Sequence, residues 1–325
     1  MFERNDVTRQ RSSGADRASG REGRGVPRRR LLQAAAASLA VACVPRVEGR
    51  ADEKGEKKRV IVGAHPWVYA ATQPKYDIYP ILDRIFADMS DAGIEGIELM
   101  HTALRPDDAV ERIASLSKKH SLPVIGSSFG GDMWDRQKHE EIFKDAERVI
   151  SRLAKLGGYT LGTSVGAVRG LKTPEQLDAQ AELLRKIIAL GKRHGVVLNL
   201  HNHTYEVVHN LHDLKGTLAR IPDVKLGPDL NWLVRGGVAP VRFIREYGSR
   251  IVFLHLRDQK ADGKWSEAMG EGAMDYAAIG KALHGINFCG PAVIELAHEG
   301  NFKPTRPLRE SLKMSREFVR KTLGY

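Results

Sequence analysis

The sequence has little cysteine, and no glycine-rich phosphate loop follows its first strand-like segment. Only two cysteines, Cys43 and Cys289, occur in 325 residues. This number excludes a framework of disulfides and a zinc site built from thiolates, so any metal must be held by His, Asp and Glu. The segment after the first strand-like run is HPWVYA, which argues against an open dinucleotide-binding sheet. The composition, 42% hydrophobic and 28% charged, predicts a packed globular core, and 325 residues are enough for one large α/β domain or two small ones.

The positive charge is concentrated near the N-terminus. The formal net charge is +11, and residues 1–58 hold 14 Lys and Arg against 8 Asp and Glu. More than half of the excess therefore lies in a short segment outside the expected fold. A nucleic-acid-binding domain would carry its basic residues on the folded part. We therefore predict that nucleic acid is not a partner.

Residues 1–51 have the features of a tail followed by an export signal. Three arginines (28–30) precede Leu-Leu and the apolar stretch 34–44, which is too short to span a bilayer, since a spanning helix takes about 20 residues. Paired arginines before x-Leu-Leu are typical of twin-arginine signals, which carry folded cargo. The alternative is a basic tail before a short alanine-rich helix. Cleavage after Ala42 or Ala51 is expected, and a lipid anchor at Cys43 is a further alternative.

The predicted location is therefore outside the cytoplasm, in the periplasm or cell envelope. The membrane is contacted only in transit unless Cys43 is lipidated. Residues 1–27 are rich in Arg, Ser and Gly, a composition typical of disorder. Residues 52–58 form a charged linker, and the fold is expected over residues 59–325.

From residue 59 onward, strand-like runs alternate with amphipathic helix-like segments eight times. We expect strands at 59–65, 94–100, 123–129, 159–164, 196–201, 224–229, 250–256 and 291–297. The segments between them, such as 139–157 and 174–195, repeat apolar residues at three- and four-residue spacing and often end in Gly. Strands alternating with helices predict a parallel sheet, and eight units in this length predict a (β/α)8 barrel.

In such a barrel the active site lies at the carboxyl ends of the strands. Strands 5 to 8 end at His201, Asp229, His255 and Glu295. Apolar neighbours flank most of these residues, as Leu254 and Leu256 flank His255, so the polar side chains are expected to point into the barrel mouth. A buried imidazole or carboxylate must be paired or must bind a metal. We therefore predict one divalent ion, Mn²⁺, Co²⁺, Zn²⁺, Fe²⁺ or Mg²⁺, with open positions for substrate oxygens.

Other polar and aromatic residues follow the same strand ends. Because all four tryptophans fall in these loops, and indole faces pack against sugar rings, a carbohydrate-sized ligand is favoured. The predicted substrate-binding residues are His65, Trp67, Trp134, Asn202, Glu206, Asn231, Trp232, Arg257, Asp258 and Trp265.

These motifs resemble the xylose isomerase-like (β/α)8 barrels, which include sugar-phosphate isomerases and epimerases. The resemblance covers residues 59–325 and rests on GIEGIEL (93–99), LHNH (200–203), PDLNW with the following GG (228–237), HLRD (255–258), GEG-x-x-DY (270–276) and VIEL (293–296). It implies that Asp229, His255 and Glu295 bind a metal and that Glu295 also acts as a base. Dimers are common in this family, so a homodimer is left open.

One position departs from the family pattern. Many members have Glu where this chain has His201, so their symmetric pair of glutamate bases is absent here. His203, Glu206 and Glu98 are the candidates for the second acid or base. The expected function is an exported, metal-dependent sugar isomerase or epimerase that abstracts a proton next to a carbonyl. The alternatives are a lyase or dehydratase acting on keto-sugars or keto-glycosides, a sugar-binding barrel without catalysis, and an abasic-site endonuclease.

Overall fold

The structure is a computed structural model that describes residues 59–325. The predicted export signal, the linker and Cys43 lie outside the described residues. All eight predicted strands are present, and most of them are shorter than predicted. The strands are β1 Val62–Ala64, β2 Gly96–Met100, β3 Val124–Gly130, β4 Thr160–Ser164, β5 Val197–Leu200, β6 Lys225–Leu226, β7 Leu254–Leu256 and β8 Ala292–Ile294.

The strands form one parallel sheet that curls into a barrel. Their order is β6-β5-β4-β3-β2-β1-β8-β7, so that the chain adds each strand beside the previous one. Parallel bridges join Leu226 to Ile251 and Asp229 to His255, and these bridges connect the β6 edge to the β7 edge. The (β/α)8 barrel predicted from the sequence is therefore confirmed.

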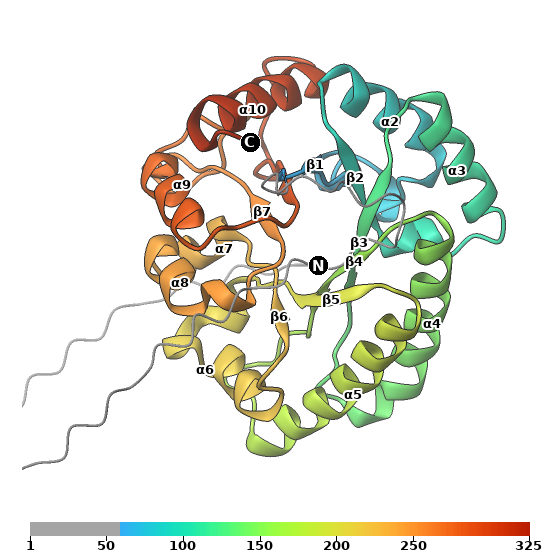
Figure 1. Ribbon diagram of the computed structural model, residues 1–325, viewed down its shortest axis with the longest axis vertical. Helices are drawn as coiled ribbons and strands as arrows, with labels where there is room; N and C mark the ends of the chain where they lie inside the picture. The colour runs from blue at the N-terminus through green and yellow to red at the C-terminus, as the bar shows by residue number, and fades with distance from the viewer. Residues whose placement is uncertain (1–58) are drawn as a thin grey trace, which may run out of the picture. The chain divides into compact units, whose positions relative to one another are not determined.

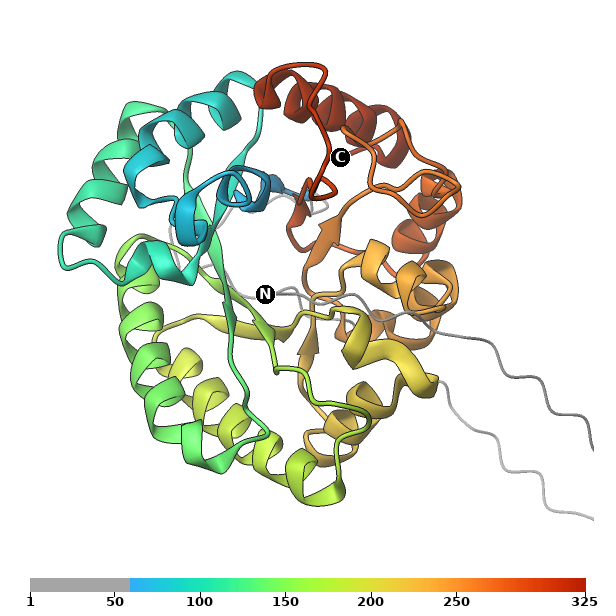
Figure 2. The same ribbon diagram turned by 180° about the vertical axis from the view of Figure 1, so that it is seen from behind.

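Helices form an outer ring around the strands, as Figures 1 and 2 show from opposite sides. They are α1 Trp67–Ala70, α2 Leu82–Asp91, α3 Ala109–Lys119, α4 His139–Lys155, α5 Pro174–Arg193, α6 Thr204–Arg220, α7 Leu230–Arg235, α8 Pro240–Tyr247, α9 Tyr276–Gly285 and α10 Leu308–Leu323. Within the described residues, no helix combines the length and the apolar character that crossing a membrane requires.

The helix ends follow from local sequence. Thr173 and Gln176 form a capping box at the start of α5, where Pro174 takes the first helical position. Gly157 and Gly195 follow α4 and α5 with φ of 80° and 69°, a left-handed conformation that other residues adopt at a cost. These signals explain why both predicted helices end where the sequence pattern ends.

Apolar side chains fill the lower part of the barrel interior. Ile125, Phe253 and Val293 form a small buried cluster separate from the larger core between the sheet and the helices. Gly63 and Gly96 make room for it, because a Cβ at either position would lie within 3 Å of the Ile125 side chain. Phe253 and Val293 share their strand faces with His255 and Glu295, so the polar groups lie one layer above this apolar floor.

Candidate metal centre

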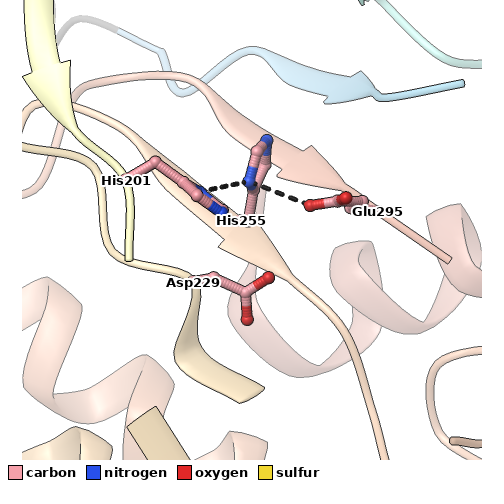
Figure 3. A group of neighbouring side chains, drawn as sticks. All are labelled: His201, Asp229, His255 and Glu295. Atoms are coloured by element: carbon pink, nitrogen blue, oxygen red, sulfur yellow. Dashed lines mark hydrogen bonds and ion pairs between the residues drawn. The ribbon is translucent and has the colours of Figure 1, made fainter. Parts of the chain in front are cut away.

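Four side chains from four consecutive strand ends converge above the apolar floor. His201, Asp229, His255 and Glu295 each offer a nitrogen or oxygen atom, and these atoms all lie within 4.8 Å of one another. Figure 3 shows His255 between His201 and Glu295, with the Asp229 carboxylate nearby. Among the residues that the structure describes, this is the one such group of His, Cys, Asp or Glu. The four residues predicted to converge at the strand ends therefore lie together in the structure.

The backbone places Asp229 beside His255. The two residues form a parallel bridge, in which the His255 N–H donates to the Pro228 carbonyl at 3.0 Å. Asp229 is also the N-cap of α7, and its Oδ1 accepts hydrogen bonds from the N–H groups of Asn231 and Trp232, both at 2.9 Å. One carboxylate oxygen thus orients the side chain, and Oδ2 faces the group.

The two nitrogens of His255 face different partners. Nδ1 lies 3.0 Å from His201 Nδ1 and 3.0 Å from Glu295 Oε2. Nε2 lies 2.5 Å from Oε2 of Glu98, whose side chain is fully buried in β2. The imidazole ring therefore separates Glu98, predicted as a catalytic acid or base, from the converging ligand atoms.

Arg257 neutralises much of the negative charge. Its Nη2 lies 3.1 Å from Asp229 Oδ2 and 2.9 Å from Glu295 Oε2. Burial alone would raise the pKa of Glu295, but Arg257 and then His255 outweigh it and hold this pKa well below its ordinary value. Burial raises the pKa of Asp229, although Arg257 acts in the opposite direction.

The two ligand-type histidines have opposite electrostatic surroundings. Burial alone would lower the pKa of His255, but the carboxylates of Glu98 and Glu295 outweigh it and raise this pKa to about 9. Burial, followed by the neighbouring His255, holds the pKa of His201 well below its ordinary value. His201 is therefore neutral near pH 7, as a metal ligand must be.

The group fits a divalent cation on two observations. Two imidazoles and two carboxylates without sulfur are a donor set that suits Mn²⁺, Co²⁺, Zn²⁺ or Fe²⁺. In addition, Oε2 of Glu295 is buried without a well-directed hydrogen bond, although it lies close to Arg257 and His255. Buried acceptors of this kind are rare unless a bound species completes them.

His203 lies next to the group but remains partly open. Its ring centroid is 4.8 Å from that of His201, and its side chain is 34% exposed. Tyr205 stacks on it at 5.4 Å, and Nδ1 lies 3.2 Å from Ser164 Oγ at the end of β4. Burial lowers the pKa of His203 to about 4.

Glu206, predicted to bind substrate or to act as an acid or base, has a structural position. Its Oε2 accepts the His203 N–H at 2.6 Å at the start of α6, and Oε1 accepts hydrogen bonds from Ser164 Oγ and the Val165 N–H. The side chain is 5% exposed. Burial raises the pKa of this carboxyl to about 8.

The aromatic residues lie mainly on one side of the site. Trp232 and Trp265 meet edge to face at 5.6 Å, and Trp232 lies 5.6 Å from the His203 ring. The Trp265 indole N–H donates to Asn231 Oδ1 at 2.9 Å, and the Arg235 guanidinium lies 4.0 Å above the Trp265 ring. The predicted residues Asn231, Trp232 and Trp265 thus form one wall.

On the β1 side, His65 approaches Glu295. Its Nδ1 accepts the Trp67 N–H at 3.2 Å and lies 3.6 Å from Glu295 Oε1, and its Nε2 lies 3.1 Å from Ser128 Oγ. Trp67 stacks on Tyr76, whose side chain is exposed. Of the predicted substrate residues, His65 is therefore the one that directly flanks Glu295 from β1.

Three predicted residues have other surroundings. Both carboxylate oxygens of Asp258 accept backbone hydrogen bonds, from Gln259, Gly270, Gly272 and Met274, and so hold the loop before α9. Asn202 is buried and its Nδ2 donates to the Asp229 carbonyl at 3.3 Å. The Trp134 indole N–H is buried without a hydrogen-bond partner among the described residues.

Sequence reasoning did not select Tyr205 and Arg235. Tyr205 stacks on His203, and Arg235 donates to Glu299 at 3.2 Å and covers Trp265. The only sequence signal for either residue is its position, two residues after His203 and three after Trp232. Such proximity is too common to predict a role.

Fold and site together define a class: a (β/α)8 barrel with a metal-type set of imidazoles and carboxylates at the carboxyl ends of its strands. The model of the xylose isomerase-like TIM barrel family matches residues 86–318, and the chain belongs to this family. The resemblance seen in the sequence motifs is therefore confirmed.

Solved structures show the same fold at low identity. A sugar phosphate isomerase/epimerase from Parabacteroides distasonis is 16% identical with a TM-score of 0.64, over 85% of this chain and 98% of that one. D-allulose 3-epimerase from a Methylomonas species is 17% identical, with a TM-score of 0.65 over 82% and 99%. The 3-keto-D-glucoside 4-epimerase of E. coli is 18% identical, with a TM-score of 0.62 over 80% and 100%. No curated protein matches significantly.

Proposed function

We propose that this protein is a divalent-metal-dependent isomerase or epimerase of a sugar or sugar derivative. The observation that carries the proposal is the set of four ligand atoms within 4.8 Å of one another, contributed by four consecutive strand ends. Membership of a family whose solved relatives include sugar epimerases supports it. A divalent ion held by these residues would polarise substrate oxygens and stabilise the enediolate left by proton removal.

The chain supplies a base and a second acid–base group on different sides of the site. Glu295 is the proposed base, because its pKa is held low and it is therefore ionised at neutral pH. His203 is the proposed partner, since it is the partly exposed candidate of the three, whereas Glu98 and Glu206 are buried behind other groups. Arg257 holds Glu295 in place, and the wall of Trp232 and Trp265 would pack against the sugar.

A lyase or dehydratase acting on a keto-sugar or keto-glycoside is the second candidate. The observation that favours it is that the strand-5 position is His201 and that the second candidate group is an imidazole, so the two-carboxylate symmetry of an epimerase is absent. After proton removal, Glu295 could give the proton that it has taken to a leaving hydroxyl, with neutral His203 as a hydrogen-bonding partner, instead of the proton returning to the same carbon. A sugar-binding barrel without turnover remains the third reading.

One experiment separates these functions. The protein is loaded with Mn²⁺ or Co²⁺ and incubated in D₂O with a panel of ketohexoses and 3-keto-glycosides. An epimerase incorporates deuterium next to the carbonyl and inverts that carbon, whereas a lyase releases water or an alcohol and forms an unsaturated product. Neither exchange nor product from any compound, despite stabilisation of the protein by one of them, would favour the binding reading.

We also propose that the protein is exported by the twin-arginine route. The support is the sequence of residues 28–44 alone, with three arginines before an apolar stretch. A reporter fused to residues 1–58 should reach the periplasm of a bacterial host. Replacing Arg28, Arg29 and Arg30 together by Lys should abolish export, and unchanged export would contradict the proposed route.

A further inference from the structure

The buried carboxylate of Glu98 lies across the His255 ring from the metal-type group, which consists of His201, Asp229, His255 and Glu295. Ile97 and Leu99 are buried in the outer core, so Glu98 points to the opposite face of β2. Its side chain has no exposed surface, and its Oε2 contacts Nε2 of His255 at 2.5 Å. The His255 ring separates this carboxylate from the converging ligand atoms, so Glu98 is poorly placed to touch the reacting atoms.

The barrel makes room for this carboxylate. A Cβ at Gly162 on β4 would lie 3.1 Å from Oε1 of Glu98 and 3.9 Å from Oδ1 of Asn199, so glycine leaves both side chains space. Both of these acceptor atoms are buried without a hydrogen-bond partner among the described residues. The carboxylate therefore has one firm hydrogen bond, and that bond goes to His255.

The direction of this bond decides which nitrogen of His255 is free. A metal binds imidazole only through a nitrogen that carries no proton. A carboxylate accepts and does not donate when ionised, so it keeps the proton on Nε2, and Nδ1, the atom nearest His201 and Glu295, is the nitrogen that gives up its proton to a metal. Without that acceptor, the buried Nε2–H would be unpaired, and the tautomer with its proton on Nδ1, facing Glu295, would be favoured.

We propose that Glu98 is a positioning residue that holds His255 in the tautomer and ring orientation needed for metal binding through Nδ1. The inference rests on the proposed metal site, and it assigns Glu98 a role distinct from acid–base catalysis. Carboxylates that accept the second N–H of a metal-binding histidine typically strengthen metal binding by about 10- to 100-fold.

Titration of the metal-free protein with Co²⁺, followed by the visible absorption of the bound ion, tests the proposal. Glu98→Leu keeps the volume and removes the acceptor, and we expect it to weaken Co²⁺ binding by about 10- to 100-fold. Glu98→Gln can direct its carbonyl to His255 and its amide toward the unpaired Asn199 oxygen, so it should weaken binding by less than about 10-fold. Equal affinities of wild type and Glu98→Leu would overturn the proposal.

A matched control is Glu95→Gln. Glu95 precedes the same strand at its other end, where it pairs with Arg316 and accepts the Val62 N–H. This variant removes a carboxylate without approaching the site, and Co²⁺ binding should not change. Thermal unfolding of each variant shows whether a loss of affinity is merely a loss of fold.

A second readout does not depend on metal. In the metal-free protein, proton NMR with ¹⁵N-labelled histidine should show the His255 Nε2–H far downfield, as expected for a short hydrogen bond to a carboxylate. This signal should be absent in Glu98→Leu and should persist, less far downfield, in Glu98→Gln, whose carbonyl is a neutral acceptor. If the wild type bound no Co²⁺, the proposed metal function would fail. If the wild type bound Co²⁺ but the downfield signal persisted in Glu98→Leu, the role of Glu98 would fail.

Discussion

Two buried polar clusters of this barrel differ in how completely their atoms are paired. The Lys172 cluster consists of Lys172, Gln180, Asp213 and Thr217, and it joins the loop after β4 to α5 and α6. Lys172 Nζ donates to Gln180 at 2.7 Å and to Asp213 at 2.5 Å, and Gln180 Nε2 donates to Asp213 and Thr217. None of its side-chain polar atoms is buried without a partner.

The metal-type group is equally buried but incompletely paired. Oε2 of Glu295 is buried without a well-directed hydrogen bond, and the same is true of Nε of Arg257 and Oε1 of Glu98, which belong to residues that contact the group. A cluster that is complete within the protein stabilises one conformation, whereas unpaired acceptors cost free energy that a bound ion or substrate can recover. The comparison therefore separates a cluster that is complete within the protein from one whose unpaired Glu295 oxygen fits the proposed metal function.

The largest expected effect comes from a change in the metal-type group. Glu295→Gln keeps the size of the side chain and removes the proposed base, so we expect turnover to fall by at least about 10³-fold. The free energy of unfolding should also fall at neutral pH, because Arg257 and His255 hold the pKa of Glu295 below its ordinary value and lose this charged partner. Deuterium exchange of the substrate in D₂O, measured beside urea unfolding, checks both parts.

The control for this variant is His255→Ala measured by elemental analysis. It should lose the metal and the activity together, whereas Glu295→Gln keeps three ligands and should retain some metal. If Glu295→Gln exchanged substrate protons at the wild-type rate, the role of Glu295 as base would be wrong even if the metal site were present.

The next largest effect comes from a change in the Lys172 cluster. Lys172→Met removes the cationic partner of Asp213 at a site where both side chains are nearly inaccessible, 2% and 6% exposed. We expect the free energy of unfolding to fall by about 3–5 kcal/mol, the usual result of removing one partner of a buried ion pair. Urea unfolding measures it, and the folded protein should keep its metal. A loss below about 1 kcal/mol, as for exposed pairs, would contradict this assignment.

A smaller effect concerns Glu206, whose pKa is raised to about 8 by burial. The folded protein then binds more protons than the unfolded chain between the ordinary pKa of Glu and about pH 8. The contribution of Glu206 to the free energy of unfolding should therefore fall as pH rises through this range and level off above it. The loss is at most a few kcal/mol, since one pKa unit corresponds to about 1.4 kcal/mol.

Urea unfolding across this pH range tests the prediction, with Glu206→Gln as the comparison. The variant carries no charge at this position, so the difference in stability between the two proteins should change with pH over this range. Parallel curves for the two proteins would show that Glu206 does not titrate in this range.

The fold and the four ligand-type residues could be predicted because both depend on local sequence. Alternation along each strand assigns His255 and Glu295 to the inside, and the barrel brings strand ends together. The convergence of Asp229 with His255 then follows from topology. No comparable local signal exists for the contact between Glu98 and His255, because these residues are 157 positions apart and meet only when the barrel closes.

Residues whose partners lie in loops were harder to interpret. Asp258 lies just after β7, the strand that contains His255. The backbone N–H groups that donate to it come from residues up to 16 positions later, in an irregular loop. Glu206 is the third residue after His203, the N-cap of α6. Its role in the capping box can be inferred from the sequence only when the start of this helix is already known. Polar residue type alone does not separate these structural roles from substrate binding.

The smallest expected effect concerns Trp265, at the edge of the site. Trp265→Phe keeps an aromatic face for the substrate and for Arg235 but removes the N–H that donates to Asn231. One neutral hydrogen bond contributes about 1 kcal/mol, so we expect KM to rise several-fold while kcat and the metal content stay near wild type. Trp265→Ala should raise KM further, because it also removes the ring. A fall in kcat comparable to that of Glu295→Gln would show instead that Asn231, Trp232 and Trp265 orient the reacting group, and would give them a catalytic role beside the metal-type group.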